Sequence, residues 1–318
     1  MAPSPHGPFW TDLCESARLH APPSCAALPP LQQPLRLALC LVGCLRTLPA
    51  SPPLLRTHLQ LAHRLAPPAS GGAAHFFVVG GSDSRDCEAS SGQAARGCTP
   101  LVYSYGAPAL RRLRETLRPR GWDVRAAWPP ARRRDVCAPQ FDKLARCLRL
   151  VEAEEARGGA RYDFVVRLRT DVAVAAASVP PPGALRRAVY ASFKNGSAAL
   201  GGGCGWERRR LCGDCSLAAR DPYGMYDLQP IIAHRNFSEG LLRWPLEVLR
   251  RKWGAPRELQ QAAVVGSCEA VATAALRKVN AVVCENPVRA ARVGKCTTAR
   301  QAQSSARPAG SGRPGSSK

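Results

Sequence analysis

Three charged residues follow a strongly hydrophobic stretch in the segment YDFVVRLRTDVAV, residues 162–174. The run from Phe164 to Val166 is continuously apolar, and Arg167, Arg169 and Asp171 alternate after it. Such a run is typical of a strand that is covered on both faces. Because burying an unpaired ion is costly, the charged residues must lie at the carboxyl end of this strand or pair with one another.

The types of these residues suit the binding of a phosphorylated ligand. In open α/β sheets, ligands lie in the crevice outside the carboxyl ends of the strands. A carboxylate such as Asp171 can hold Mg²⁺ or Mn²⁺ beside a diphosphate. Arg167 and Arg169 lie on the same side of a strand and can neutralise phosphate oxygens or hold acidic side chains in place. A structural Arg–Asp pair that braces the strand end is the competing interpretation, and the pattern leaves both open.

A second candidate for phosphate binding is the segment CLVGCLRTL, residues 40–48. Gly43 would let the backbone approach a ligand, and Arg46 could bind phosphate or brace the following loop. The segment has neither a G-x-G-x-x-G fingerprint nor a P-loop, so a purely structural turn is the favoured interpretation of this segment alone.

Short apolar runs alternate with amphipathic stretches from residue 35 onward, which predicts an α/β fold with a mostly parallel sheet. The predicted strands are 35–43, 74–81, 101–106, 121–128, 162–174, 188–193 and 281–287. The predicted helices are 51–68, 107–119, 140–158, 236–254 and 257–280, and Pro245 should kink or interrupt the fourth.

Three regions divide the chain. Residues 1–33 are rich in proline and predict a stem or linker, and residues 34–296 form the predicted single domain. Residues 297–318 are basic and rich in Ser, Gly and Pro, which predicts a disordered tail. No segment reaches the roughly 18–20 apolar residues of a membrane span, and the apolar run 35–45 is interpreted as a buried strand.

The net charge of +22 raises nucleic acid, anionic membranes and polyanionic substrates as partners. A GC-rich coding sequence would give the same excess of Arg, Ala, Gly and Pro whatever the function. The basic residues are also spread along the chain without interleaved aromatic residues, which disfavours nucleic acid.

Fourteen cysteines favour a partly disulfide-bonded protein. Glycosylation sequons at Asn195 and Asn236 indicate the secretory pathway, in the Golgi or endoplasmic reticulum lumen, with a cytoplasmic location as the alternative. Loop disulfides are a better interpretation than zinc for the cluster of Cys204, Cys212 and Cys215, since zinc needs four ligands. Cys87 and Cys98 could close a further loop.

Four segments together resemble a family of uncharacterised glycosyltransferase-like proteins of plants, algae and large viruses. They are LALCLVGCLRT, QFDKLARCLRLVEAEEARGGARYDFVVRLRTDV, DLQPIIAHRNFSEG and SCEAVATAALRKVN, and the resemblance spans roughly residues 35–290. Its most specific part is the motif YD-hydrophobic-R-x-R-x-D, from Tyr162 to Asp171.

The resemblance implies a GT-A-type, Rossmann-like domain that binds a nucleotide-sugar donor. In such domains an Asp-x-Asp motif holds Mn²⁺ against the donor diphosphate, and Asp171 takes the position nearest the metal. Asp227 and Glu269 fall on the candidate catalytic carboxylates. The sequence departs from the family pattern where Ala173 stands in place of a second acid and where Ser267 and Cys268 replace the proline context before Glu269.

The expected function is therefore transfer of a sugar from a nucleotide-sugar donor to a glycan or protein acceptor, with Mn²⁺ or Mg²⁺ as cofactor. Gly43, Arg46, Arg167 and Arg169 are the expected donor-binding residues. The alternative is a non-catalytic module of the same fold that binds acidic glycans through its basic surface, and an RNA-associated protein is a third hypothesis.

Overall fold

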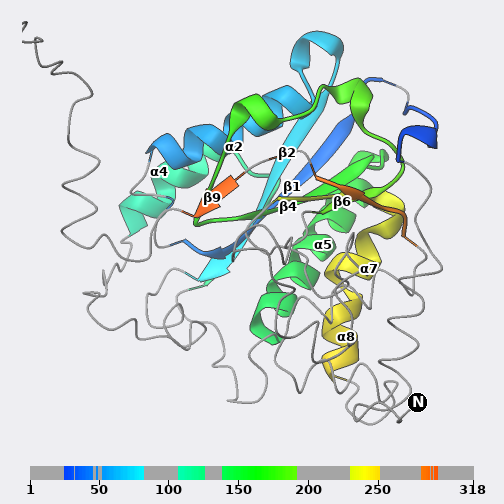
Figure 1. Cartoon of the computed structure of the whole chain (residues 1–318). Coiled ribbons are helices and arrows are strands. Elements are labelled where there is room, and N and C mark those ends of the chain that lie inside the picture. The colour runs from blue at the N-terminus through cyan, green and yellow to red at the C-terminus, as the bar shows by residue number, and fades with distance from the viewer. Residues whose placement is uncertain are drawn as a thin grey trace, which may run out of the picture.

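In the part of the chain that the structure describes, the centre is a mixed, mostly parallel seven-stranded sheet with helices on both faces (Figure 1). The structure, a computed structural model, describes residues 25–31, 33–45, 48, 52–81, 107–125, 138–191, 230–250, 281–286, 288 and 290–292. The α/β class that the alternating pattern predicts is confirmed in this part of the chain.

The strands of the main sheet follow the order β3-β2-β1-β4-β7-β6-β8. Their bounds are β1 Arg36–Cys44, β2 Ala73–Gly81, β3 Gly121–Arg125, β4 Phe164–Arg169, β6 Val189–Ala191, β7 Ile231–His234 and β8 Val283–Glu285. Strands β3, β2, β1 and β4 are parallel, β7 is antiparallel to both β4 and β6, and β6 is parallel to β8. A small antiparallel sheet pairs β5 (Val172–Val174) with β9 (Ala290–Arg292).

The helices lie on both faces of the main sheet. Figure 1 shows α2 and α4 over one face and α5, α7 and α8 over the other. Their bounds are α2 Pro52–Leu65, α4 Ala107–Leu117, α5 Ala138–Gly158, α7 Ser238–Leu242 and α8 Trp244–Arg250. Short 3₁₀ turns are η1 Cys25–Ala27, η2 Pro68–Ser70, η3 Ala176–Ser178, η4 Pro182–Ala184 and η5 Arg235–Phe237.

Strand β1 is apolar at consecutive positions because both faces of the sheet are covered. One set of its side chains joins the core under α2 and α4, and the alternating set joins the core under α5. The first set is Leu37, Leu39 and Leu41, and the second is Ala38, Cys40 and Val42. Parallel strands buried on both faces read as continuous hydrophobic runs for this reason.

Proline sets the boundary between α7 and α8. Helix α7 ends at Leu242, and α8 begins at Trp244 with Pro245 in its first turn. Proline lacks the backbone N–H that a helix interior requires but fits a first turn. The interruption predicted at Pro245 is confirmed.

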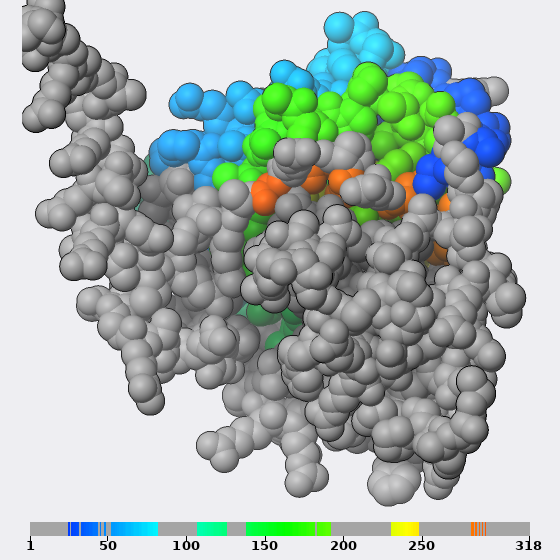
Figure 2. Space-filling view, viewed as in Figure 1, coloured from blue at the N-terminus to red at the C-terminus, as the bar shows by residue number. Residues whose placement is uncertain are grey.

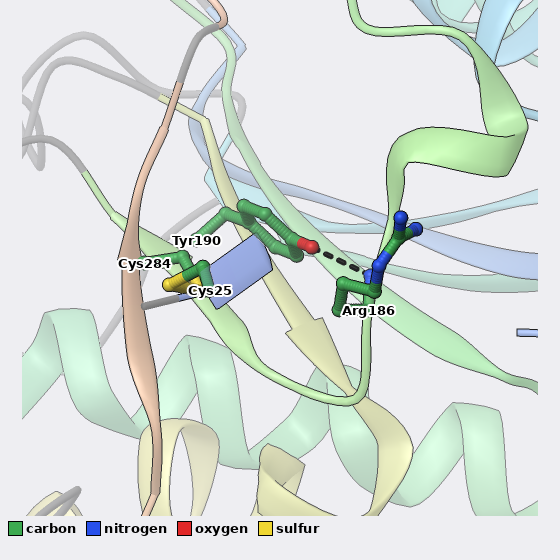
Figure 3. The surroundings of a disulfide bond; sticks show 4 residues. All are labelled: Cys25, Arg186, Tyr190 and Cys284. Atoms are coloured by element: carbon green, nitrogen blue, oxygen red, sulfur yellow. Dashed lines mark hydrogen bonds between the residues drawn. A yellow bond between two sulfur atoms is a disulfide. The ribbon is translucent and has the colours of Figure 1, made fainter. Parts of the chain in front are cut away.

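Among the described residues, two disulfides join distant parts of the chain. Cys40 on β1 is bonded to Cys147 on α5, and Cys25 is bonded to Cys284 on β8, each with a Cα–Cα distance of 5.9 Å. The second bond lies beside Tyr190, whose hydroxyl accepts a hydrogen bond from the backbone N–H of Arg186 at 2.6 Å (Figure 3). The disulfide bonding expected from the cysteine content is confirmed for these pairs.

The Cys25–Cys284 bond ties part of the predicted stem to the sheet. Residues 25–31 fall within the predicted stem, and Pro30 also forms an isolated bridge with Arg186. On the surface, the blue N-terminal residues and the orange C-terminal residues both border the green ones (Figure 2). In the described part of the chain, no helix is long and apolar enough to cross a membrane.

Several predicted features lie outside the described residues. They are the strand 101–106, the helix 257–280, the tail 297–318, Cys87, Cys98, Cys204, Cys212, Cys215 and Asn195.

Candidate functional site

The strand order places a switch point between β1 and β4. Strand β1 has β2 on one side and β4 on the other, and all three run parallel. The chain leaves β1 through α2 to reach β2, whereas β4 is reached through α5 on the opposite face. In open α/β sheets, the crevice that binds ligands lies outside the carboxyl ends of the strands at such a switch point.

Glycines keep the backbones close together at this edge. Gly43 near the end of β1 has a φ of 146°, and a Cβ built there would lie 2.8 Å from Thr170 Oγ1. Gly80 on β2 is paired with Gly43, and a Cβ on Gly80 would collide with the Gly43 carbonyl oxygen. A side chain at either position would therefore push the strand ends apart, which gives Gly43 a structural role whether or not a ligand binds.

Arg167 and Arg169 lie on the α5 face of the sheet. Arg167 is in register with Cys40 of β1, and Arg169 is in register with Val42. Cys40 and Val42 both belong to the core under α5. Arg167 is buried, with 7% of the residue exposed, while 22% of the Arg169 side chain is exposed. Arg169 is therefore the arginine nearer to the open edge.

Asp171 forms a two-point ion pair with Arg169. Arg169 donates from Nε to Oδ1 at 2.9 Å and from Nη2 to Oδ2 at 3.1 Å, and the Asp171 side chain is only 8% exposed. This is the Arg–Asp pair that the sequence left open as a brace for the strand end. Parallel N–H···O bonds of this kind fix the orientation of the guanidinium.

Helix α2 holds the segment that follows Asp171. His58 is fully buried and donates from Nε2 to the backbone oxygen of Val172 at 2.9 Å, while Val174 donates its N–H to Thr57 Oγ1 at 3.2 Å. Burial lowers the pKa of His58 to about 4, although its bond to Val172 opposes the change. The ring is therefore neutral near pH 7, and its buried Nδ1 has no hydrogen-bond partner among the described residues.

The first half of the sequence motif lies at the opposite edge of the sheet. Asp163 accepts the backbone N–H of Arg36 through Oδ2 at 2.7 Å, and the Tyr162 hydroxyl lies 2.8 Å from Nδ1 of His75. Burial raises the pKa of Tyr162 to about 12. These residues join the starts of β1, β2 and β4, which is a structural role remote from the crevice.

A buried arginine on η5 forms a second network at this edge. Arg235 donates from Nε and Nη2 to Glu155 and from Nη1 to Ser238 Oγ at 2.7 Å. Burial alone would raise the pKa of Glu155, but the hydrogen bonds from Arg235 and from the Tyr162 N–H lower it overall. The network joins α5, η5 and α7, and the sequence reasoning did not identify it.

Lys143 on α5 is a candidate that sequence reasoning also missed. It is buried, with 8% of the residue exposed. It lies one turn before Cys147, which the disulfide fixes to Cys40 at the level of Arg167. Because α5 runs from the carboxyl edge toward the amino edge, Lys143 lies toward the crevice. The sequence feature that could have identified Lys143 is its position four residues before Cys147, because residues four apart lie on the same face of a helix. That face of α5 packs on the sheet.

The described residues do not fit a metal site. No group of three or more His, Cys, Asp or Glu side chains that could hold an ion occurs among them. Both carboxylate oxygens of Asp171 accept hydrogen bonds from Arg169, and Ala173 supplies no second carboxylate. Asp171 as a metal ligand therefore stays a prediction, and the observed partner of its carboxylate is Arg169.

Three predicted site residues lie outside the described part of the chain, namely Arg46, Asp227 and Glu269. Gly43, Arg167, Arg169 and Asp171 are brought to one edge of the sheet.

Comparison with models of protein families found no matching family, and comparison with curated proteins found no matching relative.

Proposed function

We propose that the protein is a glycosyltransferase of GT-A type that transfers a sugar from a nucleotide-sugar donor to a glycan or protein acceptor. The observation that carries the proposal is the position of the Arg169–Asp171 pair at the carboxyl edge of β4, beside the end of β1. This edge is where open α/β sheets bind nucleotides. The sequence resemblance to glycosyltransferase-like proteins supports the same assignment.

The chemistry that we assign to this edge is electrostatic. When the bond between the sugar and the diphosphate breaks, negative charge develops on the leaving diphosphate, and oriented donors stabilise it. Asp171 holds the Arg169 guanidinium at two points, Nε and Nη2, and so fixes its orientation at this edge. Asp171 thus acts as a positioning residue, and Arg169 is the proposed contact to the diphosphate.

The proposed mechanism contains no step through a metal ion, because the donor set of the described residues does not fit one. The buried side chains of Arg167 and Lys143 would add positive electrostatic potential near the same edge. In an interior of low dielectric constant, such charges act over longer distances than in water. Asp227 and Glu269 stay the predicted candidates for the general base.

The test is a screen of nucleotide sugars for hydrolysis and for binding, run with EDTA and with Mn²⁺. We expect binding of at least one donor in EDTA, and we expect Arg169→Gln to weaken it by at least about tenfold, since a charge-assisted hydrogen bond contributes about 1.5–3 kcal/mol. Arg149→Gln is the matched control, because Arg149 lies on α5 and its side chain is exposed.

The outcomes of this screen separate the possibilities. Donor binding that requires Mn²⁺ and disappears in Asp171→Asn would replace the arginine-based account with metal binding at Asp171. A folded protein that binds and hydrolyses no nucleotide sugar under either condition would refute the transferase assignment.

The exposed face of α4 supports the second candidate, an acidic-glycan-binding module. Arg111, Arg112 and Arg114 are exposed on this helix, and Arg118 and Arg120 are exposed directly after it. Clustered positive charge attracts polyanions. Binding of a sulfated or carboxylated glycan that is lost with salt and is indifferent to nucleotide sugars would favour this module over the enzyme.

The proposed location is the lumen of the secretory pathway. Cys40–Cys147 and Cys25–Cys284 are bonded in the described structure. Disulfides persist mainly in oxidising compartments, which supports this location.

A further inference from the structure

We propose that Asn236 carries an N-linked glycan that is added before this part of the chain folds. Asn236, Phe237 and Ser238 form an N-x-S sequon, and Asn236 lies on η5 between β7 and α7. Its side chain is exposed, as an attachment point for a bulky glycan must be. The inference does not depend on transferase activity, since it requires only that the chain enters the lumen.

The orientation of the Asn236 amide suits attachment at nitrogen. The amide orientation that satisfies both groups is the one with the oxygen turned toward Arg187, in which Oδ1 accepts hydrogen bonds from the guanidinium, including one from Nε at 3.1 Å. In this orientation Nδ2, the atom that would carry the sugar, is the end of the amide group that does not contact the Arg187 guanidinium. Arg187 is itself exposed, so this contact leaves the Asn236 side chain at the surface.

A glycan at Asn236 would lie far from the candidate site. His234, two residues earlier, is in register with Phe164, the first residue of β4, whereas Arg169 is the last. Six residues of strand separate the two edges by about 15–20 Å. The modification is therefore compatible with a ligand at the carboxyl edge.

The third residue of the sequon limits when the modification can occur. Ser238 is fully buried, and its hydroxyl donates to the Arg235 backbone oxygen at 2.8 Å and accepts from Arg235 Nη1 at 2.7 Å. A transferase that must reach this hydroxyl cannot do so in the folded protein. The glycan must therefore be added while the segment is still extended.

The group transfer needs a co-reactant, an oligosaccharide linked through a diphosphate to a lipid. Nδ2 of Asn236 forms a bond to the anomeric carbon of the first sugar. The bond between that carbon and the diphosphate oxygen breaks, and the lipid diphosphate leaves with the bonding electrons. Nδ2 loses one proton, and no oxidation or reduction takes place.

The experiment uses the full chain produced in eukaryotic cells and carrying Asn195→Gln, which leaves Asn236 as the only sequon in the sequence. An amidase that releases N-linked glycans converts a modified asparagine to aspartate, which peptide mass spectrometry detects. We expect this conversion at Asn236, and a faster-migrating band after treatment. We also expect both signals to disappear when Asn236→Gln is added.

Two further variants separate glycosylation from folding. Ser238→Thr keeps the sequon and should keep the glycan, whereas Ser238→Ala should lose it. Because Ser238→Ala also removes the contact to Arg235, its thermal stability should fall below that of Asn236→Gln. If the peptide that contains Asn236 carries no glycan at all, the inference is overturned. This holds whether Cys40 and Cys147 are oxidised or reduced in the same sample.

Discussion

Acid should destabilise the protein through His58. The ring is fully buried on α2, and its Nε2 donates to the Val172 oxygen directly after Asp171. Burial lowers its pKa from 6.5 to about 4. The unfolded chain therefore takes up a proton at this residue near pH 6.5, while the folded chain resists protonation until about pH 4.

The sign and size of the effect follow from this difference in proton binding. Between about pH 6.5 and pH 4, the unfolded state binds more protons, so the free energy of unfolding falls as the pH falls. The full loss, reached below about pH 4, is about 3 kcal/mol, since each pKa unit corresponds to about 1.4 kcal/mol. Above pH 6.5 this contribution no longer varies.

The assay is urea unfolding at a series of pH values for the wild type, His58→Gln and His63→Gln. Glutamine does not titrate and can still donate to Val172. His63 is exposed on the same helix and serves as the matched control. We expect His58→Gln to lose about 3 kcal/mol less than the wild type over the window, and His63→Gln to follow the wild type.

His234 should titrate in the same window, because burial first and Arg187 second lower its pKa to about 4. Its contribution is present in all three proteins and cancels in the comparison. If the free energies of unfolding of the wild type and His58→Gln decline in parallel between pH 6.5 and pH 4, the reasoning about His58 is refuted.

Two further predictions concern the edge of the sheet and its covalent tie. A double-mutant cycle with Arg169→Gln and Asp171→Asn, followed by urea unfolding, should give a coupling energy of about 1–3 kcal/mol, since the pair is bidentate and mostly buried. Additive effects would show that the pair does not brace the strand end. Replacing Cys40 and Cys147 together by alanine should lower the free energy of unfolding by about 4–5 kcal/mol, because the bond spans 107 residues; a loss below about 1 kcal/mol would contradict that estimate.

Local patterns were sufficient for the parallel half of the sheet. The apolar runs that form β1, β2 and β4, and the helices α2 and α5 that connect them, follow from hydrophobic period and proline positions. Strand β7 could not be found this way. Its first three residues form a short apolar run, and the direction and neighbours of the strand depend on pairing with β4 and β6, which lie far away in the sequence.

The cysteine pairing was beyond sequence reasoning for a similar reason. Cys25 and Cys284 are separated by 259 residues, and only the assembled sheet brings them together. Cysteine content indicates disulfides but does not give their connectivity. The pairing also brings residues 25–31, predicted as stem, against the sheet.

The two-residue period of a strand predicted part of the candidate site. Alternation correctly placed Arg167 and Arg169 on one face, because side chains on a strand repeat every two residues. The motif that runs from Tyr162 to Asp171 looked like one functional unit, yet it spans the full length of β4. Its aromatic and first acid lie at the amino edge and join strands, whereas its last arginine and last acid lie at the edge where a ligand can bind.

That division has a physical consequence for the role of Asp171. Both carboxylate oxygens of Asp171 accept hydrogen bonds from Arg169, so the aspartate fixes the direction of the guanidinium. A guanidinium held at two points loses little further side-chain entropy when an anion binds to it, so the pair is better suited to hold a cationic group ready for phosphate. Under the proposed function, Arg169 at the charged end of β4 recognises the diphosphate, and Asp171 sets the direction in which the arginine points.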